Sequence, residues 1–233
     1  LLFEPWQLST QQGGPYRVFT PFWRTALTRL QLPAAMAAPR SLPALPATLR
    51  TDTLDTLQLL PRLKWDQGFW EHWHPGEAGA REMLTIFIDG ALCGYRENRD
   101  RPGRVGTSQL SPHLHFGEIA PWRIASTLLA HRNARNGAQI DSYLRQLGWR
   151  DFGYHLLHHF PDTTNQNLNP RFDQFDWATV DPVALRAWQR GKTGIPIVDA
   201  GMRQLWHTGW MHNRVRMIAA SFLCKHLRIH WIE

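Results

Sequence analysis

A hydroxyl-rich loop at residues 106–112 contains residue types that could bind a ligand. Gly106 lets the backbone turn, and Thr107, Ser108 and Ser111 place hydroxyl and backbone N–H groups just before an expected helix start. Such a loop could hold an anion, for example the diphosphate of a cofactor. Taken alone, however, the motif favours an ordinary capped loop.

Polar side chains also follow one another along an expected helix at 138–159. Tyr143, Gln146, Trp149, Arg150 and Gly153 are spaced by three or four residues or are direct neighbours, which places them close to one face. The rest of this helix is apolar on several sides, which is typical of a buried helix. A buried amide and guanidinium are costly without a partner. A planar polar ligand would supply one, and a structural hydrogen-bond network is an equally good alternative.

The last expected helix, 213–228, carries two polar faces. The face expected to look inward, where it could touch a cofactor, holds Asn213, Arg216 and Met217. The other face is a basic stripe of Arg214, Ser221, Lys225 and Arg228. A basic stripe suits phosphate groups, although a solvated helix face is the common alternative.

The composition adds weak support for a polyanion partner. Lys and Arg number 26 against 19 acids, a formal charge of +7, and there are 12 Trp. A positive excess favours association with phosphates, but a soluble protein can simply be basic. Many Trp residues indicate stacking surfaces or a redox path, and a bulky core is the simpler explanation.

The cysteines and the termini bound the class of protein. Cys93 and Cys224 are far apart, which argues against a disulfide scaffold or a zinc site, so no metal is expected and a reducing, intracellular compartment fits best. No apolar run of membrane-spanning length is present, and the segment LLFEPW does not resemble a signal peptide. The chain lacks an initiator Met and begins as if inside a larger protein.

The elements that must position these side chains are helices. The pattern predicts helices at 77–93, 121–132, 138–159, 182–190, 196–207 and 213–228. Helix starts are indicated where Thr20, Ser111 and Asp181 each precede a proline and could cap the first turn. The prolines between residues 33 and 61 exclude a long helix there and predict an interdomain linker. The fold class is therefore mainly α.

Four long motifs are similar to the photolyase/cryptochrome family over residues 1–24 and about 77–233. They are EPWQLSTQQGGPYRVFTPFWR, YRENRDRPGRVGTSQLSPHLHFGEI, LGWRDF and AWQRGKTGIPIVDAGMRQLWHTGWMHNRVRMIAASFL. The resemblance implies a helical FAD-binding domain at 76–233, incomplete at its C-terminus. It also implies an interdomain linker at 25–75, preceded at 1–24 by the closing segment of an α/β antenna domain. The family's acidic flavin-binding loop and flavin-proximal tryptophan would follow Glu233.

The resemblance also implies roles for individual residues. The positions similar to the family's FAD contacts are Tyr95, Thr107, Ser108, Gln109, Leu110, Ser111, Tyr143, Gln146, Trp149, Arg150, Asn213 and Arg216. Those similar to positions facing damaged DNA are Arg99, Gln146, Trp149, Arg214 and Met217. Trp149 would stack on a flipped-out pyrimidine dimer. Trp177 and Trp231 match the outer and middle members of an electron relay.

The implied activity is light-driven repair of cyclobutane pyrimidine dimers by electron transfer from reduced FAD. The expected protein is a cytoplasmic monomer whose partner is damaged DNA, with a methenyltetrahydrofolate or deazaflavin antenna in the preceding domain. One departure is Gln146, where the family usually has a glutamate, because an amide can hydrogen-bond bases but cannot act as an acid. A signalling cryptochrome is the first alternative. A basic helical DNA-binding module without a cofactor is the second.

Overall fold

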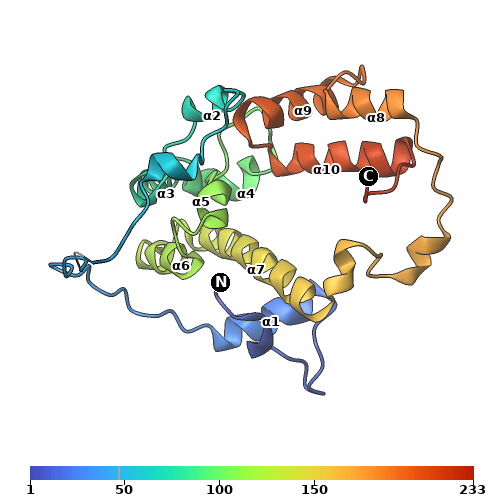
Figure 1. Ribbon diagram of the computed structural model, residues 1–233. Coiled ribbons are helices and arrows are strands. Elements are labelled where there is room, and N and C mark those ends of the chain that lie inside the picture. The colour runs from blue at the N-terminus through green and yellow to red at the C-terminus, as the bar shows by residue number, and fades with distance from the viewer. Residues whose placement is uncertain (47) are drawn as a thin grey trace.

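The long helix α7, Gly137–His159, is the axis of the computed structural model, which describes residues 1–46 and 48–233 (Figure 1). Phe22 and Trp23 of α1, Phe87 of α3 and Ile124 of α6 are buried in one core cluster with the apolar side of α7. Gly148 lets α1 approach α7 closely, because a Cβ there would lie 2.3 Å from the Trp23 ring. Segments far apart in sequence thus share one core.

The described residues contain α, 3-10 and π helices and no β-strand, so the mainly α prediction is confirmed. The α-helices are α1 Phe19–Arg29, α2 Gln67–Trp70, α3 Glu77–Asp89, α4 Tyr95–Asn98, α5 Ser111–His115, α6 Pro121–Ala130, α7, α8 Pro182–Gln189, α9 Pro196–Thr208 and α10 Asn213–Ser221. The 3-10 helices are η1 Pro5–Gln7, η2 Leu54–Leu57, η3 Ala91–Gly94, η4 Pro161–Thr164 and η5 Pro170–Gln174, and Phe222–His226 (η6) is a π-helical turn. None of the described helices is both long and apolar enough to cross a membrane.

All six expected helices form, but two are shorter than predicted. The helix expected at 77–93 ends at Asp89, because Gly90 leaves helical geometry at φ −116° and ψ −83° and η3 follows. The helix expected at 213–228 is α-helical only to Ser221 and continues as the π turn. The short helices α2 and α4 are not among the expected elements, whereas α1 and α5 were expected only as helix starts, without a range.

Only one of the three expected caps forms. Asp181 accepts a hydrogen bond from the Val183 N–H at 2.8 Å and caps α8. The other two interpretations are wrong, because α1 already begins at Phe19 with Val18 as its N-cap residue, and Leu110 occupies the N-cap position of α5. Neither of those two ends has a side-chain cap. The hydroxyl residues before Pro21 and Pro112 are therefore inside the helices.

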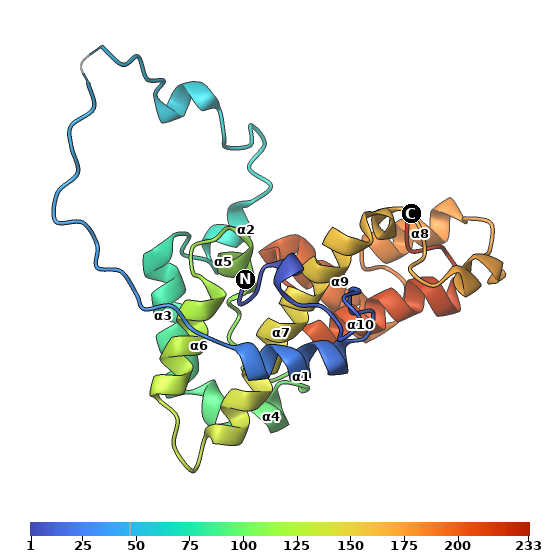
Figure 2. The ribbon, with the colours of Figure 1, turned by 90° about the horizontal axis from the view of Figure 1, so that it is seen from below.

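The proline-rich stretch forms a long excursion between α1 and α2, as expected of a linker (Figure 2). The 3-10 turn η2 is its only helical element among the described residues. Many of its apolar side chains are exposed, including Met36 at 94% and Leu63 at 80%. Helix α1 runs through residue 24, where the sequence places the end of the first segment.

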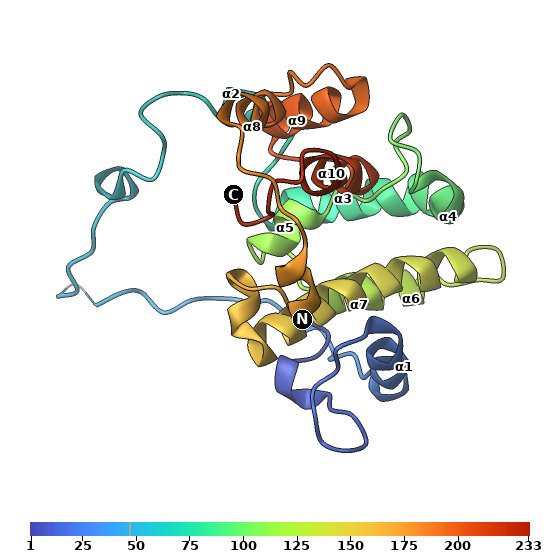
Figure 3. The ribbon, with the colours of Figure 1, turned by 90° about the vertical axis from the view of Figure 1, so that its right-hand side faces the viewer.

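Helices α8, α9 and α10 pack around a second, smaller core. Its buried residues are Val198, Met211, Val215 and Ala219. A Cβ on Gly201 would lie 2.3 Å from Val215 Cγ1, so the absence of a side chain there allows α9 and α10 to touch. In Figures 1 and 3, α10 lies between α9 and α7. This places one end of α10 beside the first core.

Two buried polar side chains of α7 hold the first residues of the chain. The Asp151 carboxylate accepts hydrogen bonds from the backbone N–H of Leu2 at 2.7 Å and of Phe3 at 2.9 Å. His155 Nε2 accepts from the Tyr16 N–H at 3.0 Å, and its Nδ1 lies 3.0 Å from the Pro5 carbonyl, to which it donates. These contacts require the neutral imidazole, because a proton on Nε2 would oppose the Tyr16 N–H.

We expect the hydrogen bonds of His155 to Tyr16 and Pro5 to make the free energy of unfolding depend on pH. Burial lowers the pKa of His155 below its ordinary value of 6.5. The unfolded chain therefore takes up the proton first, so the free energy of unfolding should fall as the pH drops from about 6.5 through the lowered folded pKa. Urea unfolding between pH 8 and 5 should show this slope in wild type and a shallower one in His155→Gln. His131→Gln, at an exposed position, should keep the wild-type slope; equal slopes in all three proteins would contradict the prediction.

Candidate functional site

A cavity of about 440 Å³ lies between α7 and the start of α10, with the loop before α5 as a third wall. Eleven of the twelve positions expected to contact a cofactor line it: Tyr95, Thr107, Ser108, Gln109, Leu110, Ser111, Tyr143, Gln146, Arg150, Asn213 and Arg216. Four separate segments of the chain thus meet at one cavity, although they are up to 121 positions apart in the sequence.

The loop wall is fixed by close backbone packing and one buried hydrogen bond. A Cβ on Gly106 would lie 2.5 Å from the Asn98 carbonyl oxygen, so glycine is required for the loop to pass α4. Gln109 adopts a left-handed conformation at φ 52°. The hydroxyls of Ser108 and Tyr143 are 2.8 Å apart, and this contact joins the loop to α7. Burial raises the pKa of Tyr143, which therefore stays a neutral hydrogen-bonding group.

Arg150 is the strongest indication of a missing partner in this cavity. Its Nη2 donates to the Leu114 carbonyl at 3.1 Å, while Nη1 is buried with no hydrogen-bond partner among the described residues. A buried guanidinium N–H without an acceptor is costly. Arg150 also lines the cavity, and rotation of its guanidinium toward the cavity would let an anionic or carbonyl-bearing ligand satisfy this N–H.

Trp149, the twelfth position, does not line the cavity. Helical geometry places it about 120° around α7 from Tyr143, because each step of three residues falls 60° short of a full turn. Its ring stacks on Phe19 of α1 with centroids 3.7 Å apart and planes inclined by 10°. Trp149 is nevertheless 48% exposed, so a second flat ring could reach it.

The inward orientation expected for one face of the last helix needs correction. The buried side of α10 is formed by Val215 and Ala219. Asn213 and Arg216 are exposed residues whose side chains border the cavity, and Met217 is 54% exposed. This face looks into a solvent-accessible cavity rather than into the core.

The residues expected to face DNA form a connected polar group beside the cavity. Arg99 Nη2 donates to Gln146 Oε1 at 3.3 Å, and the Arg99 guanidinium lies 5.5 Å from the centre of the Tyr95 ring. Arg214 Nη1 lies 3.4 Å from Met217 Sδ. Burial raises the pKa of Tyr95 to about 12. Asp100 Oδ1 links the two pairs, since it lies 3.4 Å from Arg99 Nε and 2.7 Å from Arg214 Nε, so four of the five expected positions are neighbours and Trp149 lies outside the group.

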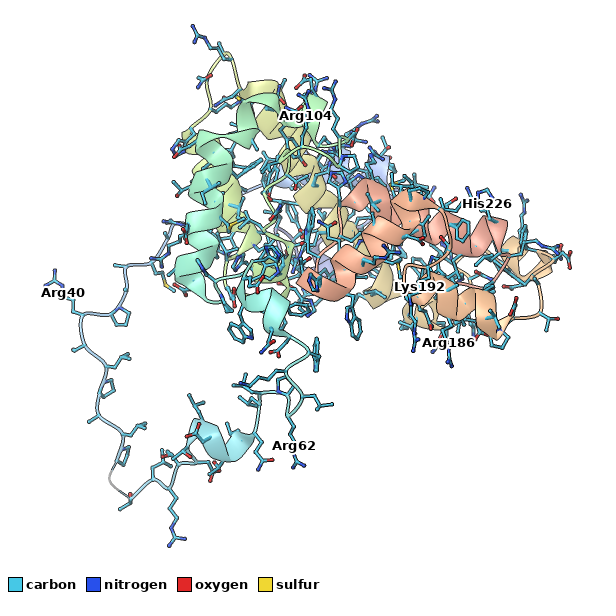
Figure 4. All side chains as sticks on the ribbon, turned by 90° about the horizontal axis from the view of Figure 1, so that it is seen from above. Arg40, Arg62, Arg104, Arg186, Lys192 and His226 are labelled. Carbon is cyan, nitrogen blue, oxygen red and sulfur yellow. The ribbon has the colours of Figure 1, made fainter. Side chains whose placement is uncertain are left out.

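The basic stripe expected on the last helix is partly neutralised, because Arg214 pairs with Asp100 at 2.7 Å and Arg228 with Asp176 at 2.6 Å. Other basic side chains are spread over the surface (Figure 4). Figure 4 labels Arg40 and Arg62 on the long loop, Arg104 after α4, and Arg186, Lys192 and His226 at the α8–α10 end.

The two expected relay tryptophans lie near each other, away from the cavity lining. His230 lies between them, with ring centroids 4.5 Å from Trp177 and 5.4 Å from Trp231. The Trp177 indole N–H donates to the Phe172 carbonyl at 3.3 Å, and that of Trp231 to Asn167 Oδ1 at 2.9 Å. The three rings form one aromatic group.

Sequence reasoning missed four residues that line the cavity, namely Leu114, Leu147, Trp210 and Met211. A spacing signal exists for two of them, since Leu114 is three residues after Ser111 and Leu147 four after Tyr143. Trp210 and Met211 directly precede the start of α10 and carry no such signal. Asp100 was missed as well, because an acid is not expected among residues that face DNA.

Comparison with known proteins identifies the matching segments. Residues 143–233 match the FAD binding domain of DNA photolyase, and residues 1–45 match DNA photolyase. A deoxyribodipyrimidine photo-lyase of Agrobacterium fabrum is 50% identical over 236 residues, covering 99% of this chain and 48% of the relative. Cryptochrome-1 of Arabidopsis thaliana is 33% identical, and the match covers 99% of this chain and 35% of the relative.

A solved structure gives the same answer. The chain matches a bacterial class III photolyase from Agrobacterium tumefaciens with a TM-score of 0.86 and 47% identity, covering 100% of this chain and 48% of that one. The chain thus spans about half the length of the photo-lyases it matches. The helical fold, the cavity and these matches agree, and the chain belongs to the photolyase/cryptochrome family.

Proposed function

We propose that the full-length protein repairs cyclobutane pyrimidine dimers in DNA with light, using reduced FAD. The observation that carries this proposal is the cavity between α7 and α10, where a buried Arg150 N–H has no partner among the described residues. The 50% identity to a photo-lyase, against 33% to a cryptochrome, favours repair over signalling.

The cavity residues suit FAD. Arg150 and Arg216 offer positive charge, and the hydroxyls of Thr107, Ser108 and Ser111 offer donors for a diphosphate. When bound, reduced FAD would supply the electron that splits the dimer and would take it back afterwards. The protein would bind and orient the flavin and shield it from water.

The lesion would be held by the chain's own aromatic and polar groups. Trp149 offers an exposed face that is already backed by Phe19, so a flipped-out dimer would stack on a stiff platform. The Gln146 amide would hydrogen-bond the bases and donate no acidic proton. Arg99, Arg214 and Met217 would face the surrounding DNA.

The remaining expectations stand as parts of the same proposal. Trp177 and Trp231 would carry electrons between the surface and the flavin. Residues 1–24 would close an α/β antenna domain with its own chromophore, a methenyltetrahydrofolate or a deazaflavin, and residues 25–75 would link it to the FAD-binding domain at 76–233. The full-length protein would act inside the cell as a monomer on damaged DNA.

Blue-light repair by the purified full-length protein tests the proposal. We expect a yellow protein that converts a dimer-containing oligonucleotide to intact DNA under blue light with a reductant. Flavin without repair would indicate cryptochrome-type signalling, and DNA binding without flavin would indicate a plain DNA-binding module.

Trp149→Ala should weaken lesion binding by roughly 1–3 kcal/mol per stacked base and change binding of undamaged DNA much less. Equal losses of affinity for damaged and undamaged DNA would show that Trp149 is not part of the lesion site.

A further inference from the structure

Asp100 is an acid among the residues proposed to contact DNA. Its Oδ1 lies 2.7 Å from Arg214 Nε and 3.4 Å from Arg99 Nε. Arg99 follows α4 and Arg214 belongs to the first turn of α10, so one carboxylate joins two segments that are 115 positions apart. The hydrogen bond from Arg214 holds the pKa of Asp100 below its usual range, and Asp100 is therefore charged at neutral pH.

The Asp100 carboxylate contributes little to the stability of the fold, because its ion pair is exposed to water. The side chains of Arg214 and Asp100 are 39% and 47% exposed. Ion pairs with that much access to water contribute little to stability. Its electrostatic effect is larger, because two guanidinium groups and one carboxylate carry a net charge of about +1 where two free arginines would carry +2.

A phosphate oxygen of DNA would compete for the same donors. Carboxylate and phosphate oxygens accept hydrogen bonds from a guanidinium in similar geometry. Phosphate binding by Arg214 therefore requires its Nε–H to leave Asp100, or requires the carboxylate to stay beside a phosphate that it repels. Either route weakens the contact.

We propose that Asp100 is a positioning residue that holds Arg99 and Arg214 together beside the cavity and limits their affinity for the DNA backbone. This inference rests on the proposed function, since it takes the two arginines as contacts to DNA. The proposed effect of Asp100 concerns the phosphate contacts, whose contribution to affinity depends on the salt concentration and is the same for damaged and undamaged DNA.

The test measures binding of an undamaged duplex by the full-length protein between 50 and 200 mM KCl. D100N is expected to bind more tightly than wild type at 50 mM, with a slope of log affinity against log salt steeper by about one. Its advantage should shrink about 3- to 4-fold over this fourfold rise in salt. D100E, which keeps the charge, should bind as wild type does.

Asp141 provides the matched control. It forms an exposed ion pair with Arg132 at 2.6 Å, neither of these two residues lines the cavity, and D141N makes the same change in net charge. D141N should keep the wild-type slope. The inference would be overturned if D100N had the same slope as wild type, or if D141N changed the slope as much as D100N does. Either result would leave the proposed repair function unaffected. Wild type that binds no DNA would overturn the proposed function and this inference with it.

Discussion

Phe22→Ala should lower the free energy of unfolding by about 3–5 kcal/mol, the usual cost of emptying a buried aromatic site. Phe22 is 2% exposed, and its ring lies 5.2 Å from that of Phe152 and 5.3 Å from that of His155. The substitution therefore leaves a cavity where α1 meets α7. Urea unfolding followed by circular dichroism would measure the loss as a lower midpoint.

Leu27→Ala is the matched control for this prediction. Leu27 belongs to the same helix but is 50% exposed, so its truncation should change stability by no more than about 0.5 kcal/mol. If both variants lose the same small amount, α1 is not part of the core and residues 1–29 dock only loosely.

Arg150→Met should reduce the affinity of the full-length protein for FAD by roughly 10- to 150-fold. This range follows from a hydrogen bond to a charged group, which is worth about 1.5–3 kcal/mol. Methionine keeps most of the side-chain volume, so the cavity retains its shape while the unpartnered buried Nη1 is removed. Flavin fluorescence during titration of the apoprotein would measure the affinity.

Arg145→Met changes the same residue type five residues, or about 1.4 turns, earlier on α7. Arg145 is exposed, with its guanidinium 5.2 Å from the centre of the Phe19 ring, and it does not line the cavity. Its affinity for FAD should match wild type. An Arg150→Met protein that binds FAD as tightly as Arg145→Met would show that the orphaned N–H serves the protein and not the ligand.

The helices were predictable where local chemistry marks their ends. Pro121, Pro182 and Pro196 each occupy a first helical position, and the periodic apolar residues after them define the length. The end of α3 also carries a local signal, because Gly90 directly follows its last residue, and the helix expected at 77–93 ran past it. The π turn after Ser221 carries no such local signal.

The site was predictable only in part, and for a physical reason. Residue types and helical spacing place Tyr143, Gln146 and Arg150 on one face, but only the fold brings the loop at 107–111 and the start of α10 against that face. The ion pair between Asp100 and Arg214 joins residues 114 positions apart. No local sequence pattern indicates such a contact, so the pairing of Arg214 with a carboxylate is seen only in the structure.

The contacts between the first residues and α7 have a consequence for biosynthesis. The backbone N–H groups of Leu2 and Phe3 donate hydrogen bonds to Asp151, which is 149 and 148 residues later in the chain, and the ring of Phe22 lies beside that of Phe152. Ribosomes add about 5–20 residues per second, so the stretch from residue 30 to residue 155 takes roughly 6–25 s to make. During that time the side of α1 that packs on α7 lacks its native partner. Residues 1–29 are therefore among the last parts of this chain to complete their native contacts, although they are made well before α7.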